Sequence, residues 1–162
     1  MKSIASIIVA LLAFVLTTGC SAKKQFADIA SNDDVTSVYI SKTMLKMAGS
    51  VGGDLSDDIN VKALIKDLDS IEILTCENAS KVKKIAPVIE QRIAALKADV
   101  LMEANEDNEN VIIYGTPDPQ NENKISNLII YTRESGELNL VVLSGTIDMA
   151  QVSSMISKER LQ

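Results

Sequence analysis

The chain has 162 residues, a formal net charge of −6, no histidine and no tryptophan. The absence of histidine excludes Ser-His-Asp and Cys-His catalysis and metal sites built on histidine. The acidic balance disfavours nucleic acid as a partner, and because no glycine-rich phosphate loop occurs we expect no cofactor.

The first 19 residues have the layout of a secretory signal peptide. Lys2 supplies a positive charge, residues 4–16 form an apolar run, and the small residue Gly19 directly precedes Cys20. The run is shorter than the roughly 18 residues that a membrane-spanning helix needs. The order is typical of a bacterial lipoprotein signal, so we predict that Cys20 carries lipid and anchors the chain in a membrane. The alternative is an ordinary signal peptide in which Cys20 has no such role.

These features divide the chain into three parts. We expect a signal peptide over residues 1–19, a lipid-anchored tether over residues 20–34 and a single domain over residues 35–162. One domain suits a chain of this length. Cys76 ends an apolar run and has no partner if Cys20 carries lipid, so we expect a buried thiol rather than a nucleophile.

The first half of the domain alternates between short strands and helices. Residues 50–58 form a loop whose aspartates suit a hard cation, but their spacing fails the calcium-loop pattern and favours a solvated loop. The longest helix begins at a cap formed by Asn78 or Ser80. In chain order, we expect a strand over 35–40, a helix over 42–49, a helix over 61–68, a strand over 70–75 and a helix over 82–100.

The second half of the domain reads mostly as consecutive strands. We expect strands over 101–105, 111–114, 125–131 and 138–143, and a last helix capped by Thr146 or Asp148. Consecutive strands favour antiparallel pairing. The predicted fold class is therefore α+β: a two-layer domain with a mostly antiparallel sheet and helices packed on one face.

Two groups of charged residues are candidates for function. The long helix carries four cations that form a candidate partner-binding surface, or else a solvated helix surface: Lys81, Lys83, Lys84 and Arg92. Three carboxylates could serve an enzyme or a small-ligand binder if two of them met in a cleft: Glu72, Glu103 and Asp148.

Several of these features occur together in a known family. The lipoprotein signal, the strand Val35-Thr-Ser-Val-Tyr-Ile-Ser entering a methionine-rich helix, and Ser144-Gly-Thr-Ile-Asp near the end resemble small Bacteroidetes lipoproteins catalogued as domain of unknown function 4252. The resemblance covers about residues 26–157 and implies an α+β fold, a lipoprotein context and no established catalytic residues.

Together these observations favour a non-enzymatic interaction or regulatory module of the cell envelope, with an envelope protein as its partner. The alternative is a small-ligand-binding protein or a carboxylate-based enzyme. The residues after Cys20, Ser21-Ala-Lys-Lys, include no acidic residue. By resemblance to known sorting signals, this favours the periplasmic face of the outer membrane.

Overall fold

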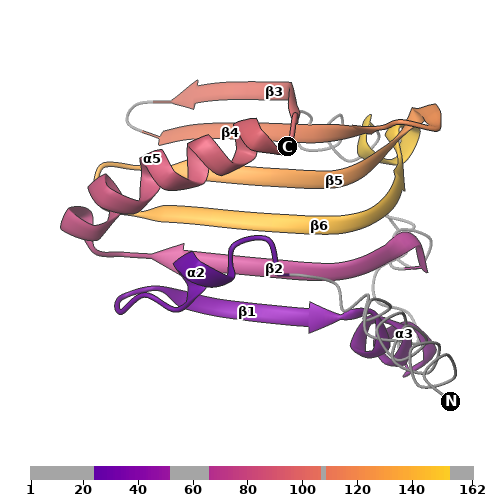
Figure 1. Cartoon of the computed structure of the whole chain (residues 1–162), viewed down its shortest axis with the longest axis horizontal. Helices are drawn as coiled ribbons and strands as arrows, with labels where there is room; N and C mark the ends of the chain where they lie inside the picture. The colour runs from indigo at the N-terminus through magenta and orange to yellow at the C-terminus, as the bar shows by residue number, and fades with distance from the viewer. Residues whose placement is uncertain (1–23, 52–65, 107–108, 154–162) are drawn as a thin grey trace, which may run out of the picture.

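The computed structural model describes residues 24–51, 66–106 and 109–153 of the chain. They form an α+β domain built on a six-stranded sheet (Figure 1). The predicted α+β class and antiparallel pairing are confirmed. The strands are β1 (Thr36–Ser41), β2 (Leu68–Cys76), β3 (Asp99–Glu106), β4 (Glu109–Asp118), β5 (Asn121–Arg133) and β6 (Leu138–Asp148).

The sheet order is β1-β2-β6-β5-β4-β3. The last four strands form a meander, because each is joined to the next by a short connection that suits antiparallel neighbours. At the β5–β6 turn, the backbone N–H of Glu134 donates to the carbonyl of Glu137 at 2.9 Å. The free edge of β6 then pairs with β2, which joins the two halves of the chain in one sheet.

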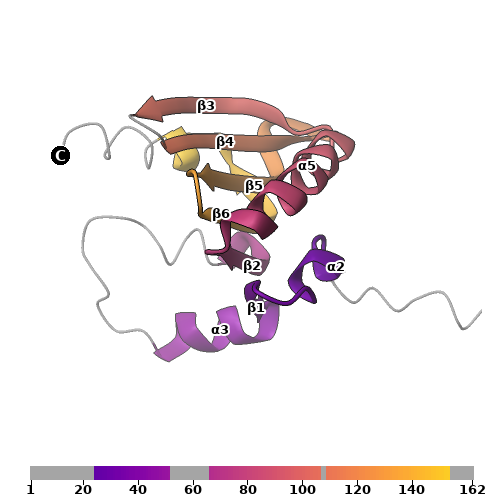
Figure 2. The ribbon, with the colours of Figure 1, turned by 90° about the vertical axis from the view of Figure 1, so that its left-hand side faces the viewer.

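Two helices cover one face of the sheet: α5 (Ala79–Ala95) and the single turn α2 (Ala27–Ala30) (Figure 2). The side chain of Asn78 accepts hydrogen bonds from the backbone N–H groups of Ser80 and Lys81, which confirms Asn78 as the N-cap. The helix ends earlier than the sequence pattern indicates. Lys97 adopts a left-handed φ of 53°, a conformation that commonly terminates helices, and Val100 belongs to β3.

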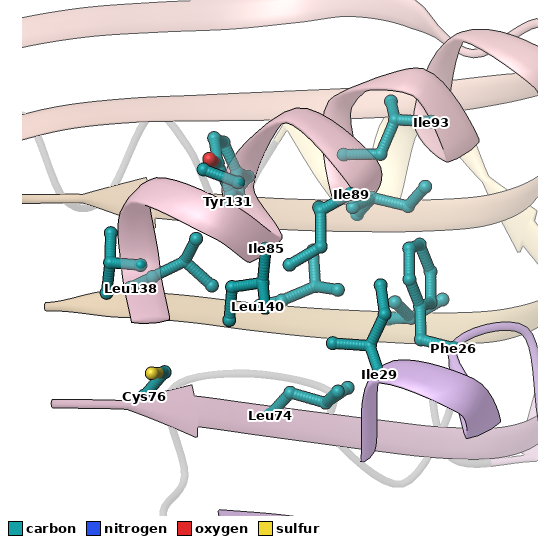
Figure 3. Close-up of a cluster of buried hydrophobic side chains, with 14 residues drawn as sticks. Phe26, Ile29, Leu74, Cys76, Ile85, Ile89, Ile93, Tyr131, Leu138 and Leu140 are labelled. Atoms are coloured by element: carbon teal, nitrogen blue, oxygen red, sulfur yellow. The ribbon is translucent and has the colours of Figure 1, made fainter. Parts of the chain in front are cut away.

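The main core lies between α5 and the sheet (Figure 3). The inner side of α5 places Ile85, Ile89 and Ile93 over Leu140 and its neighbours on the central strands. Full burial of one such side chain stabilises the fold by about 1.5–3 kcal/mol. Cys76 lies in the same cluster with 1% of its surface exposed, so the predicted buried thiol is confirmed.

The opposite face of the sheet is also apolar. The third helix, α3 (Lys42–Val51), contributes Leu45 to a second cluster with Ile113, Leu128 and Leu143. Val152, in the helical turn after β6, joins the same cluster. Helices therefore contact both faces, although α2 and α5 form the larger layer.

The start of the folded part differs from the expected boundary at residue 35. Phe26 is fully buried and Ile29 is 2% exposed, and both belong to the main core. The sequence places this stretch in the tether, because polar residues precede it and Asn32-Asp-Asp follows it. In the structure the side chains of Phe26 and Ile29 fill the space beside α5, so ordered packing against the sheet begins by Phe26.

Two predictions fall on residues that the structure does not describe. Most of the expected loop at 50–58 and most of the expected helix at 61–68 lie outside the described residues. Lys66 and Asp67, at the end of that expected helix, are helical, and β2 begins at Leu68. Within the described part of the chain, no helix is both long and apolar enough to cross a membrane.

Gly145 should be essential for the pairing of β6 with β2. Its φ is +153°, and a Cβ atom there would lie 2.2 Å from the backbone oxygen of Asp67. We expect Gly145→Ala to destabilise the domain by about 3 kcal/mol or more, because backbone strain and a backbone clash combine. Urea denaturation measures this change.

Gly136→Ala is the matched control, since a Cβ atom there would meet only Ala79 Cβ, at 3.7 Å. We expect its stability to stay within about 0.5 kcal/mol of wild type. Equal stabilities for the two variants would contradict the role assigned to Gly145.

Candidate functional site

The four candidate cations lie on α5 but do not share one surface. Arg92 donates two hydrogen bonds to the Asp28 carboxylate, at 2.6 and 2.8 Å, and one to the backbone oxygen of Gln25 at 2.8 Å. The hydrogen bond from Arg92 lowers the pKa of Asp28. Arg92 therefore attaches the N-terminal segment to α5 and is not available as a free cation.

The remaining three lysines point in different directions. Lys81 is half-buried, Lys84 is exposed, and Lys83 lines a cleft beside β4. Successive residues of an α-helix are rotated by about 100° around its axis. Lys83 and Arg92 are nine residues apart, so they lie on opposite flanks of α5. Of the predicted cationic surface, Lys83 alone contributes to this cleft.

The three candidate carboxylates are also separated. Glu72 is buried on β2, whereas Glu103 is exposed on β3, four strand positions away in the sheet order. At the usual spacing of neighbouring strands, this distance is roughly 19 Å. Asp148 caps the turn after β6 by accepting from the backbone N–H of Ala150 at 2.8 Å. The structure therefore does not bring these carboxylates together, and the described residues contain no group of three or more metal-ligating side chains.

Glu72 instead belongs to a buried polar cluster with the N-terminal segment. Its Oε2 atom accepts a hydrogen bond from the backbone N–H of Gln25 at 3.0 Å. Its Oε1 atom and the Oε1 atom of Gln25 are both buried without a partner in the described structure. Burial raises the pKa of Glu72 despite the opposing effect of the Gln25 hydrogen bond.

The helix α5 crosses the sheet obliquely (Figure 1). A cleft lies between this helix and strands β4 and β5. The helix packs on β2, β6 and β5, so part of β4 remains uncovered beside its first half. The cleft has a volume of about 390 Å³. Its principal lining residues are Lys83 and Glu90 from α5, Ile112 and Tyr114 from β4, and Tyr131 and Arg133 from β5.

Glu90 organises the polar side of this cleft. Its Oε1 atom accepts hydrogen bonds from the Tyr131 hydroxyl at 3.1 Å and from Arg133 at 3.2 Å. Burial and the nearby Glu90 carboxylate raise the pKa of Tyr131, and the same two causes together with Glu103 raise the pKa of Tyr114. Both phenols therefore stay protonated at neutral pH and act as hydrogen-bond donors rather than as bases.

Sequence reasoning missed this cleft because it depends on strand register. Tyr114 pairs with Ile129, and Ile112 pairs with Tyr131, so the two tyrosines lie diagonally on one face of neighbouring strands. One signal was present in the sequence: Lys83 and Glu90 are two helical turns apart, which places them on the same flank of α5.

The comparison with known families gives one match. Residues 26–155 match the family described as a domain of unknown function (DUF4252), and the chain belongs to this family. The match begins at Phe26, the first fully buried residue of the N-terminal segment. No curated protein and no solved structure matches the chain.

The raised pKa of Glu72 predicts a pH-dependent contribution to stability. The pKa of this carboxyl is higher in the folded state than in the unfolded state. Its protonation therefore stabilises the fold at pH values below the unfolded-state pKa, and this contribution is lost as the pH rises through the folded-state pKa. We expect Glu72→Gln to lose less stability than wild type between about pH 4 and about pH 7, which brackets an ordinary glutamate pKa. Urea denaturation at several pH values provides the measurement.

Glu77→Gln, which removes an exposed carboxyl directly after β2, is measured in parallel as the control. A Glu72→Gln profile identical to that of wild type would show that Glu72 titrates alike in the folded and unfolded states.

Proposed function

We propose that this member of the DUF4252 family is a lipid-anchored protein of the bacterial cell envelope, on the periplasmic face of the outer membrane. Its domain acts there as a non-enzymatic interaction module. The predicted signal peptide over residues 1–19, followed directly by Cys20, supports the anchor. The cleft beside α5 supports the interaction, because its titratable groups are arranged for recognition: two protonated phenols and a carboxylate held in an ion pair.

The chemistry of the cleft indicates the kind of segment that binds there. Ile112 and Val82 provide apolar surface, and Lys83 and Tyr114 provide donors that make no hydrogen bond or ion pair within the described structure. Arg133 adds a second cation that is shared with Glu90. A peptide segment with an apolar side chain next to a carboxylate fits this arrangement, since the carboxylate would accept from Lys83 and Tyr114.

The proposed partner is therefore an envelope protein that presents such a segment. This contact replaces the predicted surface of three lysines and one arginine, because Arg92 is paired with Asp28 and, of the four, only Lys83 lines the cleft.

The lining contains two cations, Lys83 and Arg133, and two carboxylates, Glu90 and Glu134. Because Arg133 is paired with Glu90, the proposed contact for a carboxylate of the partner is Lys83 together with the Tyr114 hydroxyl.

A second candidate function is the binding of a small molecule in the same cleft. The volume of about 390 Å³ lies within the range of roughly 300–1,000 Å³ that ligand sites usually occupy. Like such sites, it combines apolar surface, from Val82 and Ile112, with polar groups that could fix the orientation of a ligand. The same residues would then hold a small organic acid instead of a peptide carboxylate.

Affinity capture of the lipidated protein from solubilised membranes tests the proposed contact. We expect Lys83→Glu to lose most of the captured partner through charge repulsion, and Tyr114→Phe to lose a smaller part through the missing donor. Lys84→Glu is the matched control, because it reverses an exposed charge on the same helix outside the cleft. Its partner recovery should equal that of wild type.

Two outcomes would contradict the proposal. Equal recovery by all three variants would exclude the cleft as the protein contact. If native mass spectrometry then found a co-purified small molecule with wild type but not with Lys83→Glu, the small-ligand function would replace the interaction module.

A further inference from the structure

The two edges of the sheet present different residues. β1 and β3 are the outer strands, so one side of each has no neighbouring strand in the part of the chain that the structure describes (Figure 1). The outward backbone N–H and C=O groups of an edge strand can pair with a further strand, and proteins usually prevent this with charged side chains, proline or bulges.

The β3 edge carries two of these protections. Asp99, Glu103 and Glu106 distribute three negative charges over its eight residues. Its register with β4 is also shifted between Val100 and Met102, as in a β-bulge. Another strand from this acidic chain would therefore be repelled from β3.

The β1 edge has neither protection. Its sequence is Thr36-Ser-Val-Tyr-Ile-Ser, without a charged residue, proline or glycine, and all six residues pair with β2 in one unbroken register. The nearby cation Lys24 contacts the ring of Tyr39, 5.1 Å from its centre, on the face of the sheet that carries Glu72. β1 therefore has the composition of a strand with a neighbour on each side.

Val38, near the middle of β1, is the exposed end of an apolar row. Its side chain is 47% exposed. A further strand beyond β1 would cover it and continue the row. The row crosses the sheet in register, on the face of the second cluster, through Val38, Ile73, Val141, Ile130 and Ile113.

A second copy of β1 is a matching strand for this edge. If two β1 strands pair antiparallel about Tyr39, each Val38 lies opposite Ile40 of the other copy, and each Ser37 lies opposite Ser41. Opposite residues of an antiparallel pair point to the same face. The pairing therefore joins apolar with apolar and polar with polar side chains.

The charges at the two ends of β1 also favour an antiparallel copy. The exposed residues Asp33 and Asp34 precede the strand, and the exposed residues Lys42 and Lys46 follow it. Antiparallel pairing brings the acidic end of each copy next to the basic end of the other. Lys42 also pairs with Asp69 of its own copy, but both side chains are about half exposed.

We propose that two copies of this chain pair through β1 and join their six-stranded sheets into one, with a two-fold axis at Tyr39. The axis is perpendicular to the sheet, so α5 lies on the same side in both copies. The proposal depends neither on the lipid nor on the cleft. The interface is smaller than the roughly 1,200–2,000 Å² of stable complexes, so the dimer dissociates on dilution.

Cross-linking between introduced cysteines tests the register. In the proposed dimer, the Cβ atoms of Ser37 and of Ser41 in the other copy are about 4.5–5.5 Å apart. Within one strand these residues are roughly 14 Å apart, and the two copies of either residue are separated by about the same distance. A bis-maleimide shorter than this separation should link the Ser37→Cys/Ser41→Cys double variant into a dimer.

The two single variants are the matched controls, and we expect both to stay unlinked. Wild type treated in the same way measures any reaction at Cys20, and Cys76 is only 1% exposed. Equal linking of a single variant and the double variant would overturn the register. A double variant that is not linked would overturn the dimer.

Native mass spectrometry of the full-length protein released from detergent tests the edge itself. Wild type should change from monomer to dimer as the protein concentration rises. Val38→Lys should remain monomeric, because it places a charge against the neighbouring copy. Val100→Lys is the matched control, since it changes an exposed valine of the opposite edge strand, and it should dimerise as wild type does. Both variants should keep the wild-type circular dichroism spectrum.

A wild type that is monomeric at every concentration, or a Val38→Lys variant that dimerises as wild type does, would overturn the proposal. If the β1 amides of a monomeric wild type became protected from hydrogen exchange only after addition of a membrane extract, the edge would bind a strand of another protein instead of a second copy.

Discussion

The docking of residues 24–30 onto the sheet is the constraint on which the rest of the structure depends. Phe26 and Ile29 complete the core beside α5, and each contributes about 1.5–3 kcal/mol by burial. Gln25 donates hydrogen bonds to side chains of three strands. On the helix side, Arg92 of α5 donates to the backbone oxygen of Gln25. These contacts therefore hold the start of the described chain against both the sheet and α5.

The cleft follows from the way in which one helix covers a wide sheet. A single helix is about 10–12 Å across, whereas six strands span roughly 24 Å, so α5 cannot cover the whole face. Its oblique path leaves Ile112 and Tyr114 of β4 accessible from the cleft. Beside them, Glu90 accepts hydrogen bonds from Tyr131 and Arg133. The residues that we propose to bind the partner therefore lie at the edge of the helical layer.

Most of the regular structure could be predicted because it depends on local patterns. Alternating apolar residues indicated the strands, and the helical stripe from Val82 to Ile93 indicated α5. The N-terminal segment could not be assigned, since the attachment of Gln25 to Ser144 and of Asp28 to Arg92 joins residues far apart in the chain. The cleft was hidden for a related reason, because only the register of β4 and β5 places the two tyrosines together.

Hydrogen exchange of the backbone amides between Gln25 and Ala30 tests the central claim most directly. The N–H of Gln25 is bonded to Glu72 and that of Ala30 to the backbone oxygen of Phe26 at 2.9 Å. If this segment is part of the core, its amides should exchange as slowly as those of β2 and β6, through global unfolding. Exchange as fast as that of the exposed turn residue Gln120 would show that the segment is a free tether and would contradict the account.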